Sequence, residues 1–328
     1  MGSEPTGFAV AWPVWVERQP FADLEALRRA PVSEAVLNHL VQLADPAQPS
    51  FVVRSSGSTG EPKEFVVPKE KAWISALATR DALGLRAGMR ALLALDPNPI
   101  GGRMVLVRAL ALGLDLMVCE PATVPSRPAG GETCDLVSLV PRQLSALASE
   151  APERLARMGR VLVGGGPLHG ALPPLPVPVW HTFGMTETVS HVALRRLGGA
   201  TFRATGAARF EESEGRLVIH APQAVADPLV TNDLVRLVSP TEFEWLGRTD
   251  FAIISGGVKV LPEALESELV ALLPGREFAV VGVPSEEWGQ DVVLVVEGEV
   301  VAVPVVSLAV PIRRVVSVAA LPRLASGK

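Results

Sequence analysis

The apolar residues of this chain recur with two different spacings up to about residue 190. Short apolar runs, typical of buried strands, alternate with stretches in which apolar residues recur every three or four positions, as in amphipathic helices. Strands and helices alternating at this pace predict a largely parallel α/β sheet with helices on its faces. The predicted strands are 51–53, 64–67, 91–95, 114–119, 136–140, 160–163 and 177–182, and the predicted helices are 21–30, 33–44, 69–83, 103–112 and 141–149.

The pattern changes after residue 190. Short strands separated by turns are predicted at 192–195, 216–220, 234–238 and 243–246, which indicates a small antiparallel or barrel-like section. A helix from 262 to 273 then begins with Pro262 at its first position, and strands follow at 278–283 and 292–296. We therefore predict an α/β fold with a large N-terminal domain (1–247), a hinge (248–250) and a small, mobile α+β C-terminal domain (251–328).

Composition narrows the class of protein. Of the 328 residues, 48% are hydrophobic and 20% are charged, which is typical of a globular protein. The net charge of −5 argues against a nucleic-acid-binding face. The two cysteines, Cys119 and Cys134, lack metal-binding or redox spacing, and the apolar run 300–312 is interrupted by prolines and too short to span a bilayer. With no basic-then-apolar leader at the N-terminus, we expect a cytoplasmic protein without a membrane span, and a homo-oligomer remains an open alternative.

A loop rich in Ser, Thr and Gly lies between the first two predicted strands. Glycine allows the backbone to approach an anion closely, hydroxyl and N–H groups donate to phosphate oxygens, and a lysine adds a point charge. The spacing differs from that of a P-loop NTPase, and a strand follows the lysine where a P-loop has a helix. The loop therefore predicts a phosphate site, with a plain turn as the alternative; it reads Ser55-Ser56-Gly57-Ser58-Thr59-Gly60-Glu61-Pro62-Lys63.

Five stretches in order along the chain resemble the motifs of the adenylate-forming superfamily. This superfamily includes acyl- and aryl-CoA ligases, peptide-synthetase adenylation domains and luciferases. One such motif would be a weak signal, whereas five in order from residue 55 to residue 328 are specific. They are the loop 55–63; Thr182-Phe183-Gly184-Met185-Thr186-Glu187; Thr231-Asn232-Asp233; Gly247-Arg248-Thr249-Asp250 with Gly256-Gly257 and Pro262-Glu263; and Pro322-Arg323-Leu324-Ala325-Ser326-Gly327-Lys328.

Within the superfamily the chain is most similar to a compact form of the o-succinylbenzoate–CoA ligases of menaquinone biosynthesis. The resemblance implies attack of a carboxylate on the α-phosphate of ATP, which gives an acyl-adenylate and pyrophosphate, followed by transfer of the acyl group to coenzyme A. It also implies Mg²⁺ as cofactor. The stretches that carry this resemblance are 99–104, 107–110, 139–144, 164–168 and 184–191.

The resemblance assigns roles around the phosphates. Thr186 would donate to the α-phosphate, and Glu187 would hold Mg²⁺, with a solvated loop carboxylate as its alternative. The Lys328 ammonium would bridge the substrate carboxylate and the α-phosphate, with a frayed terminal lysine as its alternative. Family members usually continue past this lysine; if the natural chain ends here, the terminal carboxylate would weaken the field of the ammonium, and the alternative is that the natural chain is longer. The β- and γ-phosphates would be held by Ser55, Ser56, Gly57, Ser58, Thr59, Gly60 and Lys63.

Further positions resemble the adenosine site and the hinge. Phe183 would stack on adenine beside Gly184, although the family usually has tyrosine at Phe183, and a core aromatic is the alternative. Asp233 would accept from the ribose hydroxyls, after an Asn232 that replaces the usual glycine. Arg248 would reach the ribose or a phosphate, and Asp250 would be the hinge residue, with Phe251 where the family often has a second acid. The backbone of Gly164, Gly165 and Gly166 would lie against adenine and the acyl group, or form only a tight turn.

The acyl substrate is the least constrained prediction. A second carboxylate on the acid requires a cation in the acyl pocket, for which Arg103 and Arg108 are the candidates. The alternative is that both are helix-surface arginines. Ser190 and His191 are expected to line the same pocket, with a buried strand histidine as the alternative for His191. The alternative functions are a CoA ligase for another aryl or medium-chain acid, and a catalytically inactive nucleotide-binding homologue.

Overall fold

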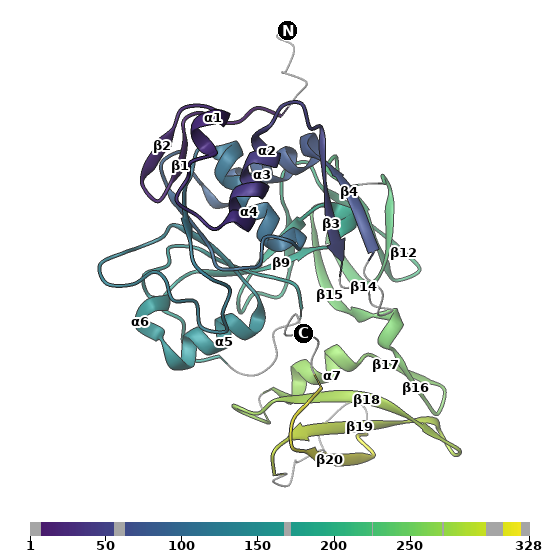
Figure 1. The fold of residues 1–328 in the computed structure, drawn as a ribbon. Helices are drawn as coiled ribbons and strands as arrows, with labels where there is room; N and C mark the ends of the chain where they lie inside the picture. The colour runs from purple at the N-terminus through teal and green to yellow at the C-terminus, as the bar shows by residue number, and fades with distance from the viewer. Residues whose placement is uncertain are drawn as a thin grey trace. The chain divides into compact units, whose positions relative to one another are not determined.

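The computed structural model divides the chain into two units (Figure 1). One unit comprises residues 1–165, 175–209 and 219–229, and the other comprises 166–174, 210–218 and 230–328. The structure describes residues 8–55, 63–166, 172–224, 226–270, 272–299 and 311–322. The hinge at 248–250 stays a prediction.

The first unit is built on a mixed sheet whose centre is parallel, as the alternation of strands and helices predicts. Strands β1, β6, β5, β7, β8 and β9 pair in parallel, and β2, β10 and β11 add antiparallel strands at the two sides. The order across the sheet is β11-β10-β9-β8-β7-β5-β6-β1-β2. The bounds are β1 (Val14–Val16), β2 (Gln19–Phe21), β5 (Arg90–Leu93), β6 (Asp115–Val118), β7 (Leu136–Leu139), β8 (Val161–Val163), β9 (Val179–Gly184), β10 (His191–Arg196) and β11 (Phe202–Ala204).

Helices cover both faces of this sheet (Figure 1). The connection from β5 to β6 and the connection from β7 to β8 move in opposite directions across the sheet. Since parallel crossovers are right-handed, their helices lie on opposite faces. The bounds are α1 (Leu24–Leu27), α2 (Glu34–Ala44), α3 (Lys69–Leu83), α4 (Ile100–Leu112), α5 (Pro141–Glu150) and α6 (Pro152–Leu155).

Most of the predicted helices are confirmed, with local corrections. The helix predicted at 69–83 is α3, which ends where Gly84 adopts the left-handed conformation. The helix predicted at 21–30 is only four residues long, and α4 begins three residues before the predicted start at 103. Ser33 stands at the N-cap of α2, but its side chain makes no capping hydrogen bond.

A separate two-stranded hairpin carries the predicted phosphate loop. Strands β3 (Ser50–Ser55) and β4 (Lys63–Pro68) pair antiparallel, and the last pair in register is Ser55 with Lys63. The strands at 51–53 and 64–67 are thus confirmed. The loop residues 56–62 between them lie outside the described residues.

The second unit contains most of the strands predicted after residue 190 and a smaller α+β section, whereas the strand predicted at 192–195 is β10 of the first unit. Strands β12 (Arg209–Ser213), β13 (Arg216–His220), β14 (Leu229–Ser239) and β15 (Glu242–Arg248) follow one another in order. A second sheet has the order β17-β16-β19-β18, with β20 paired to β19, and α7 packs on β18. The predicted helix 262–273 ends at residue 269. The bounds are β16 (Ile253–Ser255), β17 (Val258–Val260), α7 (Pro262–Leu269), β18 (Phe278–Ser285), β19 (Gly289–Glu297) and β20 (Arg314–Val318).

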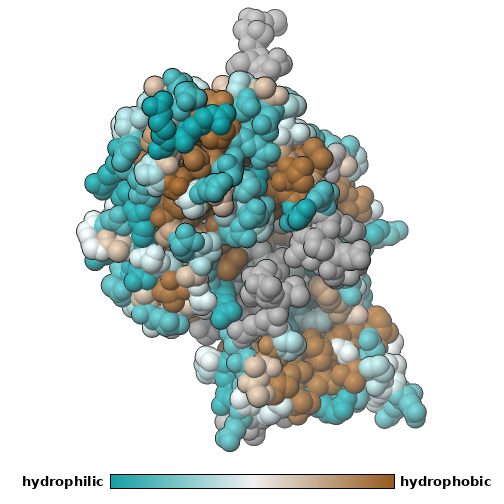
Figure 2. All heavy atoms as spheres, viewed as in Figure 1, coloured by the Kyte–Doolittle hydropathy of each residue, from teal (hydrophilic) through white to brown (hydrophobic). Residues whose placement is uncertain are grey.

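Apolar side chains are partly exposed over this second sheet (Figure 2). They include Ile254, Val281 and Val316, which are 49%, 38% and 40% exposed. In contrast, Leu269, Phe278 and Leu294 are buried, and they form the hydrophobic core between this sheet and α7. In the described part of the chain, no helix is long and apolar enough to cross a membrane.

Candidate active site

The glycine run and the aromatic motif meet at the carboxyl ends of two neighbouring strands. Strands β8 and β9 are parallel, with Val163 opposite His181, so that Gly164 lies beside Thr182. The Thr182 hydroxyl donates to the carbonyl of Val163 at 3.2 Å. A Cβ on Gly164 would lie 2.2 Å from Thr182 Oγ1, so a larger residue there would force the Thr182 side chain to move. Parallel sheets of this kind bind ligands at this edge.

Phe183 sits at the end of β9 against a second ring. Its ring packs edge-on to Phe202, with centroids 5.5 Å apart and an interplanar angle of 61°. Phe202 is buried, whereas Phe183 is only half-buried. Arg195 lies over the same Phe202 ring at 4.5 Å and contacts His181 at 3.1 Å. The stack fixes the orientation of Phe183, the residue predicted to lie on adenine.

Thr186 and Glu187 lie in a single turn of 3₁₀-helix (Thr186–Thr188) directly after β9. The Glu187 side chain is half-buried and makes no hydrogen bond or ion pair with a described residue. No group of three or more metal-binding side chains occurs among the described residues. A lone carboxylate fits Mg²⁺ that is carried mainly by substrate phosphates, because this ion is usually held by one or two carboxylates plus phosphate oxygens.

A strained γ-turn follows this 3₁₀-helix. Val189 has φ 64° and ψ −43°, and the Ser190 N–H donates to the Thr188 carbonyl at 2.7 Å. Such a backbone is unfavourable for a β-branched residue and persists only where the surroundings enforce it. The buried Thr188 hydroxyl supplies contacts to the backbone of Met185 and of Ser190, at 2.6 Å for the latter. The turn delivers Ser190 and His191 into the protein interior.

Arg108, Ser190 and His191, three of the residues predicted to line an acyl pocket, converge there around Thr79. Arg108 is only 2% exposed, so it is not the helix-surface arginine of the alternative interpretation. Its Nη2 donates to Ser190 Oγ at 3.0 Å and its Nε donates to Thr79 Oγ1 at 3.2 Å. Among the described residues no carboxylate pairs with Arg108, and burial lowers its pKa to about 10.

His191 belongs to the same cluster. Its Nε2 lies 3.1 Å from Thr79 Oγ1, and the side chain is buried. Burial and the nearby Arg108 charge hold the pKa of His191 well below its ordinary value, so the imidazole is neutral. Sequence reasoning missed Thr79, since no motif marks a single threonine inside α3.

Arg103 occupies a different place, although it is also only 2% exposed. Its Nε donates to the Pro97 carbonyl at 2.9 Å, its Nη2 contacts His39 Nε2 at 3.2 Å, and its guanidinium lies over Phe51. The alternative of a helix-surface arginine is therefore wrong here too. Five positions along α4 place Arg103 and Arg108 on different sides of the helix, and the hydrogen bond to Pro97 connects Arg103 to the loop before α4.

In the second unit, Asp233 and Arg248 form a polar cluster in which Asp233 is buried and Arg248 is half-buried. Asp233 is 4% exposed and accepts from Trp245 Nε1 at 2.9 Å and from Arg248 Nη1 at 3.5 Å. Arg248 Nη2 donates to Asp250 at 2.5 Å. Burial raises the pKa of Asp233. The hydrogen bond from Trp245 and the charge of Arg248 act in the opposite direction and lower it, but burial has the larger effect. The structure thus joins the predicted ribose and hinge residues, and Trp245 is a partner that sequence reasoning missed.

Several predicted site residues lie outside the described part of the chain. They are the loop residues 56–60 and Lys328; for Ser55 and Lys63 only the backbone pairing is described, and Gly166 ends a described segment.

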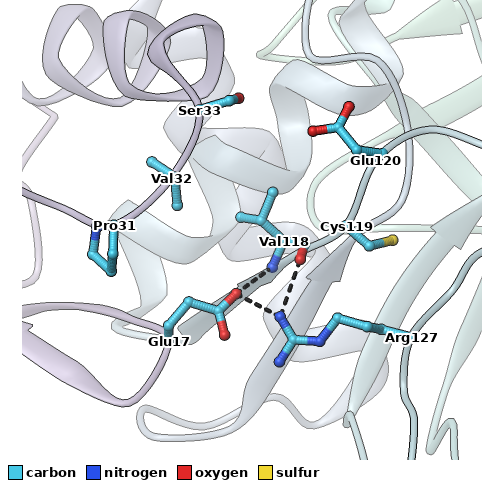
Figure 3. Close-up of a pocket in the computed structure, with 8 residues that line it drawn as sticks. All are labelled: Glu17, Pro31, Val32, Ser33, Val118, Cys119, Glu120 and Arg127. Atoms are coloured by element: carbon cyan, nitrogen blue, oxygen red, sulfur yellow. Dashed lines mark hydrogen bonds and ion pairs between the residues drawn. The ribbon is translucent and has the colours of Figure 1, made fainter.

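A separate pocket of about 370 Å³ opens beside β6 and contains none of the predicted site residues (Figure 3). At its floor Glu17 accepts from the Val118 N–H at 2.8 Å and from Arg127 at 2.7 Å. Arg127 also donates to Glu132, and these two carboxylates raise its pKa. The cation lining this pocket is therefore already neutralised by the protein, which argues against an anion site.

Comparisons with known proteins agree with the motifs. Residues 3–234 match the family described as AMP-binding enzyme. The chain is 32% identical over 303 residues to a Mycobacterium tuberculosis protein named "Probable 2-succinylbenzoate--CoA ligase", covering 84% of this chain and 78% of that protein. It spans 56–64% of the length of other curated relatives.

Solved structures show the same fold. An acyl-CoA synthetase (AMP-forming)/AMP-acid ligase II-like protein from Dyadobacter fermentans matches with a TM-score of 0.64 and 28% identity, over 94% of this chain and 96% of that chain. The o-succinylbenzoate CoA synthetase from Bacillus subtilis, solved with an acyl-adenylate intermediate, matches with a TM-score of 0.66 and 24% identity, over 84% of this chain and 67% of that chain.

Proposed function

Because this chain belongs to the family of AMP-binding enzymes, we propose that it is an AMP-forming acid–CoA ligase whose acid is o-succinylbenzoate. The resemblance to the adenylate-forming superfamily predicted from the five motifs is confirmed. The reaction consumes ATP, the acid and CoA, and it yields the acyl thioester, AMP and pyrophosphate. A place in menaquinone biosynthesis follows from that acid.

The buried Arg108 is the observation that supports a dicarboxylic acid. A guanidinium in a protein interior normally has a carboxylate partner, because an uncompensated buried charge is costly. Arg108 is held instead by the neutral hydroxyls of Thr79 and Ser190. Its positive charge remains available for an anion, and the second carboxylate of o-succinylbenzoate is an anion of the right kind.

In the first half-reaction, the other carboxylate attacks the α-phosphate of ATP and expels pyrophosphate. Negative charge gathers at the α-phosphate, so fixed donors and cations lower the barrier. Thr186 would donate to that phosphate, and Lys328 would bridge it to the attacking carboxylate. Glu187 would hold Mg²⁺, which supplies charge neutralisation on the phosphates when bound.

Phe183 and Asp233 would contact the adenosine part of the nucleotide. Phe183, fixed by Phe202, would stack on adenine next to the bare backbone of Gly164. Asp233 would accept from the ribose hydroxyls while Trp245 and Arg248 hold its carboxylate in place. In the second half-reaction the CoA thiolate attacks the acyl carbonyl and releases AMP, after rotation at Asp250 has removed Lys328 from the site.

The test is ATP–pyrophosphate exchange measured across a panel of acids. We expect exchange with o-succinylbenzoate and much less with benzoate and with medium-chain monocarboxylic acids. Exchange that favours a monocarboxylic acid would identify a CoA ligase for that acid instead. Absence of exchange with every acid, by protein that binds ATP, would identify an inactive nucleotide-binding homologue.

A further inference from the structure

Thr79 contacts two members of this polar cluster. They are Arg108, the arginine predicted to bind the acid, and His191. Thr79 is fully buried on α3, and its Oγ1 lies 3.2 Å from Arg108 Nε, 3.1 Å from His191 Nε2 and 2.9 Å from the Ser75 carbonyl. Three elements that are distant in sequence thus meet at one hydroxyl. These elements are α3, α4 and the start of β10.

The hydrogen-bonding capacity of this hydroxyl is fully used. A threonine hydroxyl has one hydrogen to donate and two lone pairs to accept with. In a helix interior it commonly donates to the carbonyl four residues earlier, which here is that of Ser75. Arg108 can only donate. If Thr79 donates to Ser75, both lone pairs accept, one from Arg108 Nε and the other from the Nε2–H of a neutral His191.

We propose that Thr79 is a positioning residue for substrate acid recognition, orienting Arg108 and His191 together through the two lone pairs of its hydroxyl. This inference rests on the proposed function, in which Arg108 receives the second carboxylate of the acid. A neutral hydroxyl is suited to this task for an electrostatic reason. An aspartate or glutamate at the same place would orient Arg108 as well, but it would cancel the charge that the substrate carboxylate needs.

The experiment compares Thr79→Val, which removes the hydroxyl at nearly constant volume, with Thr79→Ser, which keeps it. The matched control is Ser75→Ala, one turn earlier on α3, because the Ser75 hydroxyl is buried and has no hydrogen-bond partner among the described residues. ATP–pyrophosphate exchange is measured at varied o-succinylbenzoate and at varied ATP. Thermal unfolding of each variant reports on its fold.

We expect Thr79→Val to raise the KM for o-succinylbenzoate about 10-fold, because Arg108 loses the charged hydrogen bond that orients it. The KM for ATP should stay unchanged. Thr79→Ser should restore the wild-type KM, and Ser75→Ala should behave as wild type. An equal rise in both KM values, or no rise in either for a folded Thr79→Val, would overturn the proposal.

A second readout does not depend on turnover. The ¹⁵N shifts of the His191 ring in the free wild-type protein, assigned with a His191→Gln variant, report which nitrogen carries the proton. The proposal requires protonation at Nε2; protonation at Nδ1 would show that Thr79 donates to the ring and would overturn it. If the wild type exchanges pyrophosphate with no acid, the proposed function fails, and this measurement still decides the Thr79 arrangement.

Discussion

Arg108 donates through Nη2 to the hydroxyl of Ser190 at 3.0 Å, although 82 residues separate them in sequence. Ser190 reaches this position because the γ-turn at Val189 redirects the chain immediately after the Thr186–Glu187 motif. The motif assigned to phosphate chemistry and the arginine assigned to the acid are therefore connected through four residues of backbone.

Replacing Arg108 with glutamine should abolish selectivity for a dicarboxylic acid. The variant loses the charged hydrogen bond to the second carboxylate, so kcat/KM for o-succinylbenzoate should fall about 100-fold. The fall for a monocarboxylic acid should be small, since that substrate has no carboxylate at this place. Exchange assays with both acids measure the difference. A parallel loss for both acids would contradict the assignment.

The corresponding change at Arg103 separates the two predicted arginines. Because Arg103 connects the Pro97 carbonyl, His39 and Phe51, Arg103→Gln should lower the melting temperature without changing the preference between the two acids. Calorimetry and the same pair of exchange assays measure this. A selective loss of o-succinylbenzoate activity would instead place Arg103 in the acyl pocket, as the sequence allows.

Gly184 is a position where no side chain fits. A Cβ there would lie 2.3 Å from the Ser190 carbonyl oxygen and 2.5 Å from His191 Cα. Gly184→Ala must therefore displace the γ-turn, and exchange activity should fall by about 100-fold or more with every acid, as expected when phosphate donors are misplaced. Gly131→Ala is the control, because a Cβ there would meet no atom of the described residues within 4 Å. Equal activity of the two variants would contradict this account.

Asp233→Asn tests the ribose contact. The asparagine can still accept from Trp245, but it loses the negative charge opposite Arg248, and one of its two oxygens becomes an amide nitrogen. The KM for ATP should rise about 10-fold while the KM for the acid changes little. Asp81→Asn, at an exposed aspartate of α3, serves as the control. An unchanged KM for ATP would remove Asp233 from the site.

Glu266 gives the second unit a pH-dependent stability. It is 8% exposed, its Oε1 accepts from the Val280 N–H, and burial raises its pKa to about 7 from 4.5. The folded state therefore binds this proton more tightly than the unfolded state, and the resulting stability is present below about pH 4.5 and lost as pH rises to about 7.

Glu266→Gln should remove the loss of stability that the wild type shows as the pH rises to about 7. At pH 8 the variant should be more stable than wild type by roughly 1 kcal/mol or more, and at pH 4.5 the two should be similar. Urea unfolding of the full chain, followed by tryptophan fluorescence at the two pH values, measures the difference. A variant that is less stable at pH 8 would show that the Glu266 carboxylate is favourable in its charged form.

Lys328→Ala should separate the two half-reactions. Without the ammonium, formation of the acyl-adenylate should fall about 100-fold or more, because the crowded anions at the α-phosphate lose a cation. Conversion of a supplied acyl-adenylate and CoA to thioester should continue, since in the proposed mechanism Lys328 has left the site before that step. Rapid-quench assays of each step measure this. Equal loss in both steps would remove the lysine from its assigned role.

The sequence by itself determined the fold class and the chemistry. Hydrophobic periodicity is a local property, so the alternation that predicts α3 and the parallel strands can be read without contacts. The motifs are local too, and their order identified the superfamily. The same reasoning placed Arg103 and Arg108 together as equal candidates, with the helix surface as the alternative for both.

Only the tertiary structure decided which polar groups face each other. Thr79 accepts from Arg108 across 29 residues and lies against His191 across 112 residues, and no local pattern carries such a pairing. The packing of α3 and α4 against the sheet buries both arginines and sends them to different partners. Among the described residues both arginines are buried without an ion-paired carboxylate. What distinguishes them is the set of partners that the fold supplies: Thr79 and Ser190 for Arg108, and the Pro97 carbonyl and His39 for Arg103.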